Sequence, residues 1–81
     1  MKKNLSPKDS FLAQILSLIS REKASLQISN LEEMSLRIQI ADIFKQNDNL
    51  EKIFYKIADL LYENSLKKLT PQIRNKYKKI I

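Results

Sequence analysis

Apolar residues recur at three- and four-residue steps in four segments of the chain, which is the spacing of one face of an α-helix. The clearest case lies within residues 50–61, whose apolar positions fall in an arc of about 160° at 100° per residue. An arc of that width can contact two neighbouring helices at once. The pattern predicts helices near 7–22, 31–46, 49–65 and 71–81.

Residues typical of a helix start precede each predicted helix. Ser6 with Pro7 and Asp9 supplies a cap hydroxyl, a proline where a missing N–H costs nothing, and an acid in the first turn. The other start signals are Asn30 with Glu33, Asp48 with Glu51, and Thr70 before Pro71. The longest connection is expected from about residue 21 to residue 29.

The second segment carries apolar residues on two sides, and we expect both sides to be buried. One side holds Leu31, Met34, Ile38 and Ala41, and the other holds Leu36, Ile40, Ile43 and Phe44. Residues 26–28 and 36–40 also alternate apolar and polar residues, as a half-buried strand does. We prefer a helix, because Glu33 and Arg37 have a favourable i, i+4 spacing and the chain has no glycine for a hairpin turn.

Short connections between amphipathic helices favour antiparallel neighbours. The expected fold is therefore all-α, an antiparallel up-down four-helix bundle that forms a single domain over residues 1–81. A secretory signal has a basic start followed directly by an apolar stretch. Here Pro7, Lys8 and Asp9 separate the opening MKKN from the apolar residues 11–19, so we do not expect a signal. No run approaches the roughly 20 apolar residues of a membrane-spanning helix. We expect a cytoplasmic, monomeric protein.

Composition narrows the chemistry, because the 81 residues include no Cys, His, Gly or Trp. Disulfides, thiolate or imidazole zinc sites, cysteine nucleophiles and Ser-His-Asp relays are excluded. Glycine-rich phosphate loops are excluded as well. The acidic pairs Glu32–Glu33 and Asp59–Glu63 are typical of a solvated surface rather than of a metal or glycosidase site. We expect a protein that is not an enzyme, uses no cofactor or metal, and acts by binding.

Charge is segregated along the chain. Acidic and basic residues balance over residues 1–63, so that the net charge of +6 is carried by the last 18 residues, which include no acid. These cations form either a solvated helix face or a surface for an acidic protein, an anionic membrane or a nucleic acid. The candidate partner-binding cations are Lys67, Lys68, Arg74, Lys76, Lys78 and Lys79.

Three tyrosines are further candidate contacts. Tyr55 and Tyr62 are seven residues apart and share one side of the third predicted helix, just outside its apolar arc. They either close the seam against a neighbouring helix, which we favour, or anchor a partner through ring and hydroxyl. Tyr77 faces inward with Ile73 and Ile80, so a core position is preferred to a partner contact.

The segment DNLEKIFYKIADLLYENSLKKLTPQIRNKYKKII, residues 48–81, combines a long amphipathic helix, a short lysine-bearing link, a Thr cap and a last helix. With its size and basic character, the chain resembles the class IIa, or pediocin-like, bacteriocin immunity proteins. The resemblance implies a cytosolic four-helix bundle that protects a bacterium from a pore-forming peptide. It implies action at the inner membrane face, on the mannose phosphotransferase permease with bound bacteriocin.

The resemblance also implies that recognition lies in residues 50–81, which include the six cations. Many members of the family continue past the fourth helix into a longer tail, whereas this sequence ends at Ile81. We expect the positive end to contact an anionic membrane face peripherally while the bundle binds the permease.

Two other functions stay open. A small nucleic-acid-binding protein would use the last helix for recognition, through Gln72, Arg74, Asn75, Lys76 and Lys79. We do not favour nucleic acid, because the polar residues of that helix spread over about 200° and no second basic element would clamp the phosphate backbone. A helical antitoxin or adaptor that masks a partner protein is the third alternative.

Overall fold

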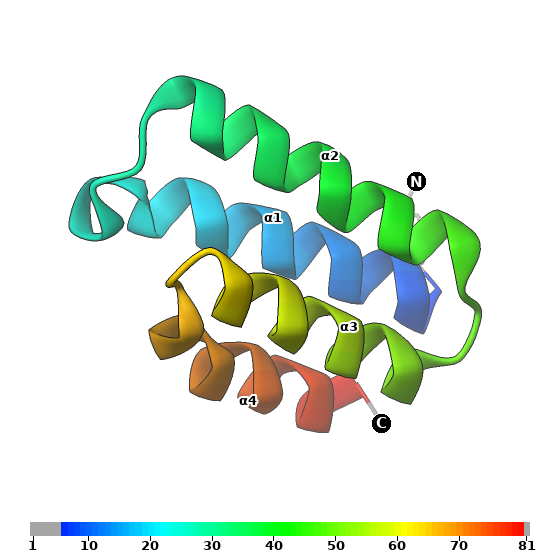
Figure 1. Cartoon of the computed structure of the whole chain (residues 1–81). Helices are drawn as coiled ribbons and strands as arrows, with labels where there is room; N and C mark the ends of the chain where they lie inside the picture. Colours follow the sequence, from blue (N-terminus) through cyan, green and yellow to red (C-terminus); the bar gives the residue numbers. More distant parts are fainter. Residues whose placement is uncertain (1–5, 81) are drawn as a thin grey trace, which may run out of the picture.

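The computed structural model describes residues 6–80, and the expected all-α four-helix bundle is confirmed (Figure 1). Its helices are α1 (Pro7–Leu26), α2 (Asn30–Gln46), α3 (Leu50–Glu63) and α4 (Thr70–Ile80), with a short 3₁₀ helix η1 (Lys67–Leu69) before α4. Residues 6–80 include no strand, so the strand alternative for the second segment is wrong. Within this range, no helix has the length and apolar character needed to cross a membrane.

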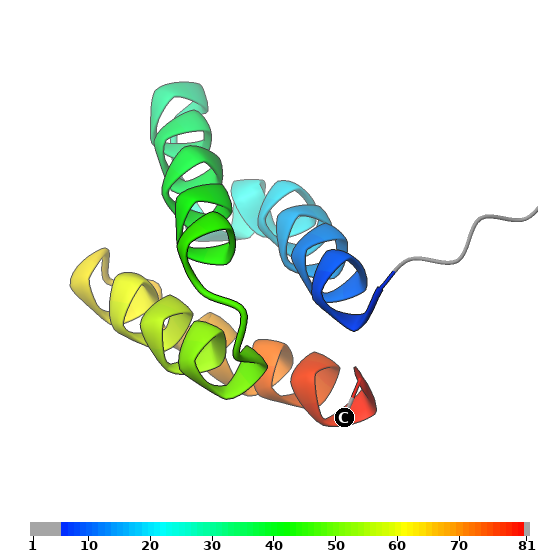
Figure 2. The ribbon, with the colours of Figure 1, turned by 90° about the vertical axis from the view of Figure 1, so that its right-hand side faces the viewer.

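The helices form a ring in which each packs against its neighbours in the chain and α4 closes the ring against α1. Neighbouring helices run in opposite directions (Figure 1). The end-on view in Figure 2 places α2 and α4 at opposite corners. The outward faces of these two helices therefore point to opposite sides of the molecule.

The start of α1 is confirmed, whereas two of the other caps are shifted by one residue. The Ser6 hydroxyl accepts a hydrogen bond from the Asp9 backbone N–H at 3.1 Å. The cap of α2 is Ser29 rather than Asn30, because Ser29 is the residue with extended backbone. In the capping box, the Glu32 backbone N–H donates to the Ser29 hydroxyl, and the Ser29 backbone N–H donates to the carboxylate of Glu32 rather than of Glu33. Similarly, Asn49 rather than Asp48 caps α3, by accepting from the backbone N–H of residue 52.

The helix ends differ more from expectation. Helix α1 continues to Leu26, so most of the expected long connection is helical, and the chain turns through Gln27 in the left-handed region at φ 56°. Helix α3 ends at Glu63, after which Ser65 adopts φ 60°. Residues with left-handed backbone at a helix end are usually glycine or asparagine. Because this chain has no glycine and uses Gln27 and Ser65 there, the sequence gives little local signal for these turns. Thr70 is the first residue of α4, with φ −56° and ψ −45°, and not its cap.

One core, with contributions from all four helices and η1, holds the bundle together. An aromatic cluster lies near the end where α1 begins: the Phe11 ring lies 5.7 Å from Phe44 and 5.8 Å from Tyr77, and Tyr77 stacks on Phe54 at 5.1 Å. Tyr77 is thus half-buried core, as preferred. The fully buried large side chains are Phe11, Ile15, Leu18, Ile19, Ile40, Ile53, Ile57, Leu61, Leu69 and Ile73.

Helix α2 corrects the expectation that both of its apolar sides are buried. Leu36, Ile40 and Phe44 are buried, but the other side is open to solvent: Leu31 is 78% exposed, Met34 58% and Ile38 60%. The reason is geometric, because a helix at the corner of a four-helix ring turns only one face toward the core. The helices that pack against α2 are α1 and α3, and on its outward side only Ala41 is half-buried, in a hollow that it shares with the start of α1.

The corrected cap makes a testable prediction. Ser29→Ala removes the hydroxyl that accepts from the Glu32 N–H and is expected to lower the free energy of unfolding by about 1 kcal/mol. Asn30→Ala is the matched control and should change it by less than about 0.5 kcal/mol, because Asn30 is already helical. Urea unfolding followed by circular dichroism measures both variants. A larger loss for Asn30→Ala would contradict the assignment of the cap.

Candidate functional site

The predicted basic site lies on α4 and η1, which are anchored to the bundle by apolar residues on one side. Leu66, Leu69 and Ile73 are buried, and Tyr77 and Ile80 pack against the core. The remaining positions of these elements face outward. Five of the six candidate cations are exposed, and Lys76 is half-buried.

None of the six cations forms an ion pair with a carboxylate of residues 6–80. The ion pairs in this range are Lys8–Asp48, Arg21–Glu22 and Lys23–Glu33, all outside η1 and α4. The segregation of charge along the sequence therefore persists in space. Any attraction of these side chains for negative charge is available to a partner.

The cations do not form a single stripe on α4. Arg74 and Lys78 are four residues apart and share one flank of the helix, whereas Lys76 and Lys79 are three apart and share another. The Arg74 guanidinium carbon lies 5.9 Å from the centre of the Phe54 ring, which places the first flank beside α3. Lys67 and Lys68 extend the positive charge to the start of α4.

Tyr55 and Tyr62 are exposed on α3, so the preferred expectation that they close a helix seam is wrong. Tyr55 is 60% exposed and Tyr62 69%. The Tyr55 ring lies 5.4 Å from Phe54, the same ring that Arg74 covers. Tyr62 lines a shallow surface depression together with Ser65 and Lys67. Both tyrosines thus adjoin the positive surface of α4 and η1, in positions suited to partner contact.

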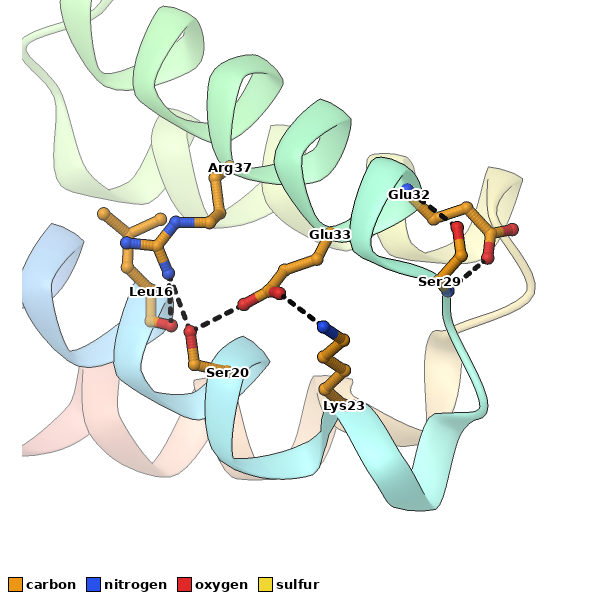
Figure 3. A network of polar contacts seen from close by, with 7 residues as sticks. All are labelled: Leu16, Ser20, Lys23, Ser29, Glu32, Glu33 and Arg37. Carbon is orange, nitrogen blue, oxygen red and sulfur yellow. Dashed lines mark hydrogen bonds and ion pairs between the residues drawn. The ribbon is translucent and has the colours of Figure 1, made fainter.

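A polar network between α1 and α2 is a feature that sequence reasoning missed (Figure 3). The Ser20 hydroxyl donates to Glu33 at 2.8 Å, and the Lys23 ammonium lies 3.2 Å from the same carboxylate. Arg37 donates to the Ser20 hydroxyl at 2.8 Å and to the Leu16 carbonyl at 3.3 Å. The hydrogen bond from Ser20 and the contact with Lys23 hold the pKa of Glu33 below its usual value. Glu33 is therefore ionised at neutral pH, and its negative charge is paired with Lys23, while Arg37 is held by hydrogen bonds to Ser20 and to the Leu16 carbonyl.

Acidic clusters and surface hollows are the remaining features of the described residues that could hold a small ligand. Within residues 6–80, no three acidic side chains lie close enough together to hold a metal ion. A small hollow of about 90 Å³ lies between the start of α2 and the end of α3, lined by Glu32, Ser35 and Asn64 above Leu36. Glu32 is occupied there by the capping bond to Ser29. The hollow holds no nucleophile with an orienting base.

Comparisons with known proteins gave no match to a family model, to a curated protein or to a solved structure. The function has therefore to be inferred from the charged and aromatic surface of α3, η1 and α4.

Proposed function

We propose that this protein is an immunity protein of the pediocin-like bacteriocin type, which protects its host cell from a pore-forming peptide. It is not an enzyme and acts in the cytoplasm by binding the receptor permease, with its bacteriocin, at the inner membrane face. The observation that carries the proposal is the set of six cations on η1 and α4 without an acidic partner among residues 6–80. Because these cations are held on a rigid bundle without an internal acidic partner, they can bind a negatively charged surface of another molecule.

The physical mechanism combines long-range attraction with short-range contact. The cations lie within a Debye length of an anionic membrane face once the protein approaches it, and each contributes about 1 kcal/mol near such a surface. Tyr55 and Tyr62 lie beside the positive surface, where exposed rings can bury area against a protein partner. The charge brings the bundle to the membrane face, and the tyrosines contribute affinity for the permease–bacteriocin complex.

A protection assay tests this function. The chain is expressed in a bacterium that is sensitive to pediocin-like peptides, and the inhibitory concentration of each peptide is measured. We expect protection against at least one peptide and its loss when Lys76, Lys78 and Lys79 are all changed to Glu. Full protection by a folded charge-reversed variant would exclude the charge mechanism, and no protection against any peptide would contradict the proposed function.

The matched control reverses three lysines outside the site. Lys45, Lys52 and Lys56 are exposed on α2 and α3 and belong to neither η1 nor α4. Changing all three to Glu alters the net charge by the same amount and should leave protection intact. Equal loss in both variants would indicate that total charge, and not the α4 surface, matters.

Nucleic-acid binding by α4 is the alternative function, and gel shifts of the parent and of the same charge-reversed variants distinguish it from immunity. Phosphate neutralisation predicts an affinity that falls steeply with salt, so a gel-shift series with duplex DNA and RNA distinguishes it. The cations of α4 lie on two flanks of the helix and not on one groove-facing stripe, which does not favour a recognition helix. Tight, salt-dependent binding to nucleic acid without protection would replace the immunity function.

A further inference from the structure

The outward side of α2 carries a row of exposed apolar residues that the basic surface does not use. Leu31, Met34 and Ile38 are the most exposed large aliphatic side chains among residues 6–80. With Ala41, they recur at alternating steps of three and four residues. That is the a and d spacing of a helix seam in a coiled coil, here on the side of α2 opposite the core. We call these four residues the α2 seam.

The charged residues beside the α2 seam gather at its Ala41 end, where Asp9 and Lys45 line one hollow with Ala41 and Asp42 is exposed next to it. Around Met34 and Ile38 the exposed neighbours on α2 are the uncharged Ser35 and Gln39. Helix α1, which packs against α2, exposes the small uncharged residues Ala13, Ser20 and Ala24. Between the two helices, Lys23 pairs with Glu33, and Arg37 is engaged by hydrogen bonds to Ser20 and to the Leu16 carbonyl (Figure 3). Depletion of free charge around exposed apolar side chains is the pattern of an interface centre.

Net charge restricts which contacts two copies of this chain can make. Each copy carries +6, and most of the unpaired positive charge lies on η1 and α4. Helices α2 and α4 occupy opposite corners of the bundle (Figure 2). A contact through α2 therefore holds the two positive surfaces as far apart as the fold allows, and it leaves both of them free to bind.

The α2 seam is also self-complementary in size. In an antiparallel pair centred near residue 36, Leu31 lies opposite Ala41 of the partner subunit, and Met34 lies opposite Ile38 of the partner subunit. A large residue then meets a small one at each end, and two residues of similar size meet at each inner position. Such a contact is isologous, because the same surface serves both copies.

We infer that the α2 seam is the contact of a weak homodimer, in which two copies pair α2 against α2 in antiparallel orientation. The seam is one helix face and is smaller than the 20–30 residues a side of a standard interface. The dissociation constant is therefore expected between about 0.1 and 1 mM. The dimer presents two positive surfaces on its opposite sides.

Sedimentation velocity from about 10 μM to about 1 mM measures this association. We expect the mean mass to rise with concentration, and to rise further in high salt, because salt screens the repulsion between two positive copies. The variant Met34→Glu/Ile38→Glu should stay monomeric at every concentration. The matched control Tyr55→Ser/Tyr62→Ser removes two exposed rings elsewhere and should associate like the parent. A parent that is monomeric throughout, or association that the Glu variant retains, would overturn the inference.

Cysteine cross-linking tests the register, since the chain has no cysteine of its own. A mixture of Met34→Cys and Ile38→Cys should form a mixed disulfide under mild oxidation, several-fold faster than a mixture of Met34→Cys and Tyr62→Cys. Equal rates would reject the antiparallel register. Both measurements use purified protein, so their outcome is independent of whether the chain protects cells from a bacteriocin.

Discussion

Replacing Phe11 with alanine is expected to cost about 3–5 kcal/mol of folding free energy, because truncating a buried Phe removes its transfer energy and leaves a cavity. Phe11 is 0% exposed, and its ring contacts Phe44 of α2 and Tyr77 of α4, which in turn stacks on Phe54 of α3. All four helices contribute a ring to this cluster. A domain of this size has a total stability of only about 5–10 kcal/mol, so the variant should be close to unfolding.

Thermal unfolding followed by circular dichroism measures the effect, and the midpoint should fall by more than about 10 °C. Tyr55→Ala is the matched control, because it removes an aromatic ring that is 60% exposed and should change stability by about 0.5 kcal/mol or less. A midpoint for Phe11→Ala within a few degrees of the parent would contradict the central place of the aromatic cluster.

The second large effect concerns binding to an anionic membrane. The parent protein should bind vesicles that contain phosphatidylglycerol and should bind vesicles of phosphatidylcholine alone only weakly. Removing the attraction of Lys76, Lys78 and Lys79 costs about 1 kcal/mol each near an anionic surface, and the added carboxylates are repelled. The triple change to Glu should therefore lower the vesicle partition coefficient at least about 100-fold.

Vesicle co-sedimentation over a salt series measures this partition. Binding should weaken as salt rises, because the Debye length falls from about 10 Å at 0.1 M to about 3 Å at 1 M. The triple reversal of Lys45, Lys52 and Lys56 should lose much less, since these residues lie on α2 and α3. Salt-independent binding, or an equal loss in both variants, would show that the lysines of α4 do not direct the protein to a membrane.

The elements were predictable from the sequence where the signals are local. Ser6, Pro7 and Asp9 mark the start of α1 because a cap hydroxyl acts on the first turn alone. The start of α2 was missed by one residue for an equally local reason. Both Ser29 and Asn30 are good caps, and each is followed three residues later by a glutamate. Only the backbone conformation of Ser29 decides between them.

Exposure was harder to predict, because it depends on how the four helices are arranged around each other. The spacing of Leu31, Met34 and Ile38 is the spacing of a buried face, and it cannot reveal that α2 occupies a corner with nothing beyond it. The same holds for Tyr55 and Tyr62, which lie just past the edge of the buried arc of α3 and not in a seam. Periodicity identifies a helix face, but tertiary packing decides whether it is covered.

The sequence was sufficient to predict the positive charge of the candidate site, but not the contacts that its side chains make with other helices. Residues 67–79 include no acid, so the positive charge of this end could be read from the sequence, and no helix brings an acid to pair with it. The position of Arg74 over Phe54 and the network of Glu33, Lys23 and Ser20 depend on the alignment of different helices. No spacing within one helix carries that information.

The contact between Phe11 and Tyr77 joins the first helix to the last, and this has a consequence for how the chain is made. During synthesis α1, α2 and α3 can emerge and collapse together, but the ring stays open until α4 has left the ribosome. Until then, the apolar side of α1 lacks the helix that covers it. The nascent chain therefore depends on α4 to cover Phe11, and termination before α4 should yield an aggregation-prone fragment rather than a smaller bundle.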